Sequence, residues 1–86
     1  MRLDQFLKET RIIKRRTLAK QMCDEGFVLI NSKKAKASYE VKIGDIIDIY
    51  FKQKKIKYRI ESIPQKGTRK NEASEYYTLL GEEYYE

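Results

Sequence analysis

The sequence predicts an α+β fold in which two N-terminal helices pack beside a small antiparallel β-sheet. Apolar residues recur at helical spacing up to Gly26, and short β-rich or alternating runs follow it. No segment of helical pattern separates the later strand candidates, so the crossovers that a parallel sheet needs are not available. With 86 residues, the chain has room for one small domain.

The first helix is predicted within residues 1–9. Its apolar residues stand at positions i, i+3 and i+4, which places them on one face of about two helical turns. These residues are Leu3, Phe6 and Leu7. Arg2 and Asp4 lie beside this stripe, and we interpret Asp4 as a residue that caps the helix or orients an arginine.

The second helix is predicted from about Arg15 to Glu25, with Gly26 as its C-terminal stop. One face of this helix is apolar and is expected to pack in the core. The residues of that face are Leu18, Ala19, Met22 and Cys23.

Several short strands are predicted after the helices. Residues 27–30 form a β-rich run, and Asn31-Ser32 is expected to turn the chain into a second strand at Lys33-Lys34. Residues 46–51 and 54–63 alternate between apolar and polar positions, and Pro64 closes the second of these runs.

The C-terminal part differs in composition from the rest. We expect residues 1–64 to form the domain with its β extension, and residues 65–86 to form a polar loop followed by an acidic, Tyr-rich segment. A short C-terminal helix is predicted over residues 72–80, with Tyr76, Leu79 and Leu80 as its anchors.

The composition excludes several kinds of chemistry. The chain has no His, and Cys23 is its single cysteine, so Ser/His and Cys/His nucleophiles, an internal disulfide and a Cys/His zinc site cannot be built. We therefore expect no catalytic residue, no metal and no cofactor. No apolar stretch approaches the roughly 18 residues of a membrane span, which predicts a cytoplasmic protein without a membrane partner.

The charge pattern indicates a polyanionic partner. The net charge is +6, and residues 71–86 contain five acids and no base, so all basic residues precede them. A run of five bases without an acid lies in the loop before the second helix and in that helix, and a second basic tract lies at the hairpin tip. The candidate phosphate-binding residues are Arg11, Lys14, Arg15, Arg16 and Lys20 in the run, and Lys33, Lys34 and Lys36 at the tip.

Other residues are interpreted as structural. Four lysines near residue 55 are expected to protect the edge of the sheet rather than to contact RNA. They are Lys52, Lys54, Lys55 and Lys57. The tyrosines of the C-terminal segment could stack on bases, but packing or a protein contact is favoured because acids surround them. They are Tyr76, Tyr77, Tyr84 and Tyr85.

Five elements in order resemble the signature of the S-four (S4) RNA-binding domain family. They are Arg2-Leu3-Asp4 with Leu7, Arg16 with Ala19, Gly26, Val28 with Ile30-Asn31, and Val41 with Gly44-Asp45. The resemblance implies that the two helices and the following hairpin form a face for structured RNA, chiefly rRNA and tRNA, and it adds Arg2 to the RNA-binding residues. The family commonly has Gly after Asn31, whereas this chain has Ser32, where the hairpin often turns through positive φ.

The short chain and its run from Arg11 to Lys20 are most similar to the branch of this family that acts in ribosome-associated quality control. This resemblance implies a monomeric factor without enzymatic activity that binds 23S rRNA of the 50S subunit together with peptidyl-tRNA. It also implies support of C-terminal alanine tailing by the partner factor RqcH. Two alternatives are a heat-shock-type 50S rescue factor without tailing, and an RNA-binding accessory subunit of a separate RNA-modifying enzyme.

Overall fold

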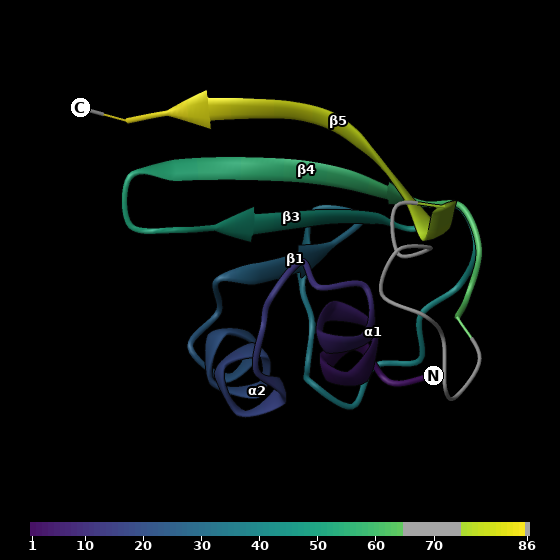
Figure 1. Ribbon diagram of the computed structural model, residues 1–86. Coiled ribbons are helices and arrows are strands. Elements are labelled where there is room, and N and C mark those ends of the chain that lie inside the picture. The colour runs from purple at the N-terminus through teal and green to yellow at the C-terminus, as the bar shows by residue number, and fades with distance from the viewer. Residues whose placement is uncertain (65–74, 86) are drawn as a thin grey trace.

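The computed structural model describes residues 1–64 and 75–85, which form two helices beside a five-stranded antiparallel sheet (Figure 1). The helices are α1 (Leu3–Glu9) and α2 (Arg16–Asp24). The strands are β1 (Val28–Ile30), β2 (Lys33–Lys34), β3 (Ile46–Tyr50), β4 (Lys54–Ile60) and β5 (Tyr77–Tyr84). The predicted α+β fold is confirmed.

The sheet has the strand order β2-β1-β3-β4-β5, and every neighbouring pair is antiparallel. Val28 and Ile30 of β1 lie opposite Ile49 and Ile47 of β3, so these four side chains share one face of the sheet. They are buried in one core with the apolar stripe of α1, including Phe6. The pair β4–β5 extends away from the helices, and we call it the β-arm (Figure 1).

The connection between the two helices is anchored at both ends. The Thr10 hydroxyl donates to the Phe6 carbonyl at 2.7 Å, and the Ile13 N–H donates to the Leu7 carbonyl at 3.0 Å. The Ile13 side chain is buried in the core, and Arg11 has a φ of 63°. This loop therefore has a defined course on the end of α1.

Helix α2 is buried through a narrower face than predicted. Ala19, Met22 and Cys23 are buried, but Leu18 is 45% exposed, so the expectation that Leu18 packs in the core is wrong. Helix α2 packs mainly on α1 and β1, and the residues of its first turn, 16–18, are all exposed. Neither described helix is long and apolar enough to cross a membrane.

The hairpin turn forms where it was predicted. Asn31 and Ser32 have φ values of 51° and 72°, the two positive values of a type I′ turn between β1 and β2. Glycine tolerates such a conformation better than serine does. Ser32 thus stands where the resemblance to the family led us to expect a positive φ.

The predicted C-terminal helix is wrong, because residues 77–84 form strand β5. This strand pairs with the whole of β4, and the Tyr77 and Tyr58 rings meet edge to face with centroids 5.2 Å apart. The pairing with β4, rather than the local helical spacing, therefore determines the conformation of residues 77–84. The loop predicted for residues 65–71 and the start of that helix lie outside the described residues.

Candidate nucleic-acid interface

All nine predicted RNA-binding residues have exposed side chains, and they lie on four segments of the chain. Arg2 lies just before α1. The loop between the helices holds Arg11, Lys14 and Arg15, and α2 holds Arg16 and Lys20. Strand β2 and the residues after it hold Lys33, Lys34 and Lys36. The geometry shows which of them come together.

A buried carboxylate links the two helices at the start of this surface. Asp4 is 3% exposed in its side chain, and its oxygens lie 3.3 Å from Arg2 Nε and 3.4 Å from Arg16 Nε. The Gln5 N–H also donates to Asp4 Oδ1 at 2.8 Å. The interpretation of Asp4 as an arginine-orienting residue is therefore confirmed.

Both arginines remain available to an outside ligand. The Arg2 and Arg16 side chains are 44% and 48% exposed, and each reaches Asp4 through one edge of its guanidinium group. A guanidinium group carries five N–H donors in a fork that matches a phosphate. Asp4 thus holds two forked donors in place while most of their N–H groups face outward.

The backbone fixes Arg2 against the segment that follows β2. The backbones of Arg2 and Glu40 form an isolated antiparallel β-bridge. The N–H groups of Leu3 and Asp4 donate to the carbonyls of Tyr39 and Ala37 at 2.7 and 3.1 Å. The hairpin and α1 are therefore joined at the site where Arg2 projects.

An open groove of about 620 Å³ separates α2 from the segment after β2. Four of the nine predicted residues line it, from both sides: Arg2, Lys20, Lys34 and Lys36. Two acids line the groove as well, and Asp24 pairs with Lys20 at 3.2 Å. The groove is basic on the side of Arg2 and the hairpin, and its charge is partly offset at the C-terminal end of α2.

Gly26 lets the hairpin approach the end of α2. Its φ is +83°, and a Cβ at this position would lie 3.1 Å from Lys34 Cε. The helix thus ends in the left-handed conformation that glycine favours, and the Lys34 side chain passes directly over it.

A second groove of about 600 Å³ lies on the other side of the same segment. Lys33, Lys34 and Lys36 line it together with Tyr39. Segment 34–38 therefore forms a basic ridge between the two grooves. We call Arg2, Arg16, Lys20, Lys33, Lys34 and Lys36 the basic face.

A second buried carboxylate holds the base of the hairpin. Asp45 is 7% exposed and accepts from the Tyr39 hydroxyl at 2.9 Å, the Lys42 N–H at 2.9 Å and the Asn31 amide at 3.1 Å. Asn31 in turn accepts from the Ile46 N–H at 3.0 Å. The hydrogen bond to Asp45 raises the pKa of the Tyr39 hydroxyl, which therefore stays protonated as a donor.

Residues 1–47, which hold this whole arrangement, match the S4 domain. The chain belongs to the S4 domain family. The paired arginines, the hairpin and the turn that ends at Asp45 are the elements of the signature predicted from the sequence.

Among its relatives in the S4 family, the chain is similar to proteins named RQC P-site tRNA stabilizing factor. It is 48% identical to the one from Bacillus subtilis over 96% of this chain and 95% of that protein. The protein of this name from Streptococcus pneumoniae is 38% identical over 95% of this chain and 92% of its own.

Two solved S4-like structures have the same fold. The trimeric structure of heat shock protein 15 from Vibrio cholerae matches with a TM-score of 0.82 at 32% identity, over 92% of this chain and 80% of that one. The solution structure of a hypothetical protein matches with a TM-score of 0.81 at 38% identity, over 94% and 98% of the two chains.

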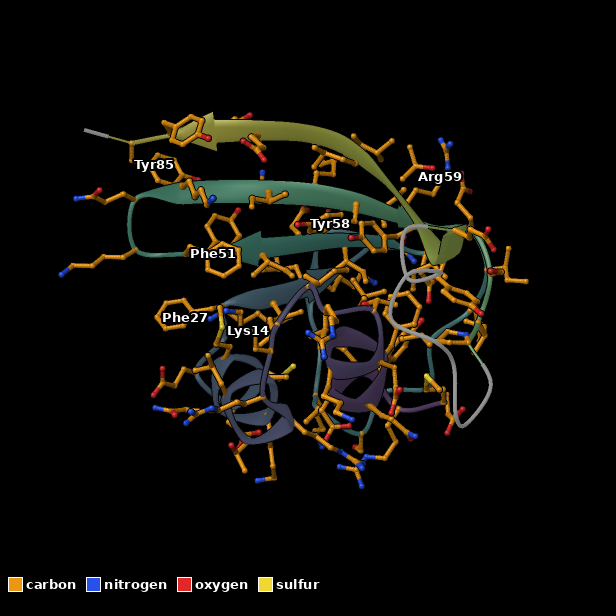
Figure 2. All side chains as sticks on the ribbon, viewed as in Figure 1. Lys14, Phe27, Phe51, Tyr58, Arg59 and Tyr85 are labelled. Carbon is orange, nitrogen blue, oxygen red and sulfur yellow. The ribbon has the colours of Figure 1, made fainter. Side chains whose placement is uncertain are left out.

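Four of the predicted residues line neither groove of the S4 domain: Arg16, which joins the basic face through its ion pair with Asp4, and three residues of the loop before it. Arg11, Lys14 and Arg15 lie on the loop between the helices, and Figure 2 shows Lys14 on this loop. Arg15 occupies the N-cap position of α2 without a capping hydrogen bond from its side chain. These three residues add positive charge beside the basic face.

Sequence reasoning placed Asn31 in the hairpin turn but did not predict its hydrogen bond with Asp45, although both residues belong to the family signature. Their contact spans 14 residues of sequence, so no local pattern reveals it. The signature element Gly44-Asp45 and the predicted turn at Asn31-Ser32 were the available signals.

The chemical groups of this site suit binding of an anion. In the described part of the chain, no group of three His, Cys, Asp or Glu residues could hold a metal ion. Burial, together with the negative charge of Asp4, raises the pKa of the Cys23 thiol to about 11, so this residue is an unreactive thiol at neutral pH.

Proposed function

We propose that this protein is a non-enzymatic RNA-binding factor whose basic face contacts rRNA and tRNA. The observation that carries the proposal is the pair of arginines from two helices that share the buried Asp4 carboxylate. Such fixed forks suit phosphate groups of structured RNA, while the lysines of the ridge add mobile charges. The proposed RNA-binding residues are the basic face together with Arg11, Lys14 and Arg15.

The names of its relatives support a more specific role. We propose that the protein binds 50S subunits that carry peptidyl-tRNA, contacts 23S rRNA and stabilises the tRNA in the P site. In this role it acts in the cytoplasm as a monomer and supports alanine tailing of the nascent chain with RqcH. We propose that residues 1–64 are the RNA-binding domain with its β extension and that residues 65–86 are a polar loop and an acidic, Tyr-rich segment, of which residues 77–84 form β5.

A second candidate function is favoured by the similarity to heat shock protein 15. In that case the protein would rescue stranded 50S subunits without tailing. The two candidates share the same RNA contact and differ in the fate of the nascent chain. A strain that lacks this protein but retains RqcH distinguishes them, because only the first candidate predicts a loss of alanine tails.

The RNA contact is tested by sucrose-gradient sedimentation of the tagged protein with RNA crosslinking. We expect the wild type to migrate with 50S particles and peptidyl-tRNA, and Arg16→Ala to weaken subunit binding more than fivefold with a nearly unchanged thermal midpoint. Removing two phosphate contacts in Arg2→Ala/Arg16→Ala should also reduce the slope of log affinity against log salt by about 1.5.

A charge-matched control removes two bases outside the basic face, in Lys42→Ala/Arg59→Ala. This variant should keep both the binding and the salt slope. Equal losses in the two double variants would show that net charge alone drives binding. Lost binding accompanied by unfolding of Arg16→Ala would assign this residue a structural role instead.

A further inference from the structure

Exposed aromatic rings gather at the end of the sheet where β3 turns into β4. Figure 2 shows Phe27, Phe51 and Tyr85 along this end, with Arg59 at the opposite end of the β-arm. Phe27 and Tyr85 are each 45% exposed and Tyr84 is 70% exposed, whereas Phe51 is half-buried. We call the four rings and the two lysines of the turn the aromatic end: Phe27, Phe51, Lys52, Lys54, Tyr84 and Tyr85.

Backbone hydrogen bonds place these residues on adjacent strands. The Tyr50 N–H donates to the Phe27 carbonyl at 2.8 Å, and the Tyr85 N–H donates to the Gln53 carbonyl at 2.9 Å. Neighbouring strands are about 4.8 Å apart, so Phe27 on the β1 side and Tyr85 on the β5 side lie roughly 14 Å apart. This span fits a short stretch of unpaired nucleotides.

A cavity lies at the turn between β3 and β4, beside the rings of Phe51 and Tyr84. Its volume is about 380 Å³, and it is open to solvent and lined by Phe51, Tyr84 and the turn residues 52–54. The exposed Tyr84 ring and the partly buried Phe51 ring thus face a common space.

Positive charge lies directly beside the rings. Lys54 Nζ is 5.8 Å from the centroid of the Phe51 ring, and Lys52 is exposed. Within residues 1–64 and 75–85, neither lysine forms an ion pair. The nearby acids have partners, since Glu82 accepts from the Tyr84 hydroxyl at 2.7 Å and Glu83 lies opposite Lys55.

The position of β5 in the sheet is inconsistent with the structural role expected for Lys52 and Lys54. They were expected to protect the edge of the sheet, but β4 pairs with β5 along its whole length and is not an edge strand. The chemistry also favours RNA over a protein, because lysine is depleted in protein interfaces, whereas aromatic faces beside cations bind successive bases of single strands.

We propose that the aromatic end is a second RNA contact, which stacks unpaired bases while the basic face binds the phosphates of structured RNA. The proposal extends the proposed function, because it assigns to the same RNA partner a segment that is not base-paired. It requires that the aromatic end bind single-stranded RNA even when the basic face is altered.

Binding is measured with a labelled oligoadenylate of ten nucleotides. The variant Phe27→Leu/Tyr85→Leu keeps apolar side chains and removes two rings, and stacking on each base predicts an affinity at least about fivefold lower. The matched control Ile43→Ala/Leu79→Ala truncates two exposed apolar side chains elsewhere and should leave the affinity unchanged. Both variants should keep the thermal midpoint of the wild type.

A spectroscopic measurement tests stacking directly. Because the chain has no Trp, Phe51→Trp introduces a single indole at the aromatic end. We expect oligoadenylate to quench its emission, both alone and in combination with Arg2→Ala/Arg16→Ala. Absence of quenching, or equal affinities of the wild type and Phe27→Leu/Tyr85→Leu, would overturn the proposal.

The results separate this proposal from the proposed function. Loss of 50S binding in Arg2→Ala/Arg16→Ala together with unaltered oligoadenylate binding in Phe27→Leu/Tyr85→Leu would overturn only the second contact. Quenching by oligoadenylate without any 50S binding by the wild type would overturn only the ribosomal role. Crosslinking of the aromatic end to a protein, with oligoadenylate affinity unaffected by loss of the rings, would show a protein docking surface and contradict the proposal.

Discussion

A buried carboxylate in the basic face joins bases from two segments, whereas an exposed carboxylate in the β-arm pairs with one base of its own segment. In the basic face, the buried Asp4 is shared by Arg2 and Arg16, and both guanidinium groups keep outward N–H donors. In the β-arm, the exposed Glu61 pairs with the single Arg59, which lies two residues before it and donates from Nε and Nη2 at 3.1 and 3.2 Å.

This difference shows why counting bases does not locate a binding surface. A buried acid that two bases share fixes both of them relative to each other, because its charge has little access to solvent. An exposed acid beside a single base neutralises it at a cost in side-chain freedom and contributes little to stability. Of two equally basic regions, the one organised around a buried acid is therefore better prepared to bind phosphate.

The largest expected effect concerns the core that supports the basic face. Phe6 is fully buried between the helices and the sheet, so Phe6→Ala should destabilise the protein by about 3–5 kcal/mol. Leu79 in the β-arm is 51% exposed, and Leu79→Ala should change the stability by less than about 0.5 kcal/mol. Denaturant unfolding measures both values, and similar losses would contradict the difference between the regions.

A smaller effect is expected from two glycines, one in each region. Gly26→Ala places a Cβ on a residue with φ of +83° and 3.1 Å from Lys34 Cε, and it should cost about 1–2 kcal/mol. Gly81 in β5 has no neighbour within 4 Å of such a Cβ, so Gly81→Ala should be neutral or slightly stabilising. The free energies of unfolding compare the two sites, and a neutral Gly26→Ala would show that the end of α2 is not constrained.

The smallest effect tests the exposed ion pair of the β-arm. Hydrogen bonds from Arg59 and Thr78 lower the pKa of Glu61 below its ordinary value of 4.5. A depressed pKa in the folded state gives stability that is present above pH 4.5 and is lost as the pH falls through the folded value. The thermal midpoints of the wild type and Glu61→Gln should therefore differ slightly near neutral pH and converge in acid, and a difference that persists in acid would contradict this origin.

Local spacing was sufficient to predict both helices, the hairpin and strands β3 and β4. It failed at β5, where Leu79 pairs with Tyr58 and Gly81 pairs with Lys57, so that Leu80 is an additional residue between them. Such a bulge interrupts the alternation by which a strand is recognised. Tyr76, Leu79 and Leu80 then stand at positions i, i+3 and i+4, which is the spacing of an apolar helix face.

The candidate site was predictable in its composition but not in its geometry. The run of bases marked α2, and the family signature added Arg2, but the contact of Arg16 with Asp4 joins residues twelve positions apart on two helices. The exposure of Leu18 was missed for a related reason, because the packing angle of α2 rather than its periodicity decides which residues the core covers.

The most direct test of this account is the affinity of Asp4→Asn for purified 50S subunits that carry peptidyl-tRNA. Asparagine keeps an oxygen that can accept from the Gln5 N–H, and it removes the charge that holds Arg2 and Arg16. If Asp4 orients the arginines, the affinity should fall at least about fivefold, although the variant is more positive than the wild type. An equal or higher affinity, with the thermal midpoint preserved, is the result expected from independent surface charges and would contradict the account.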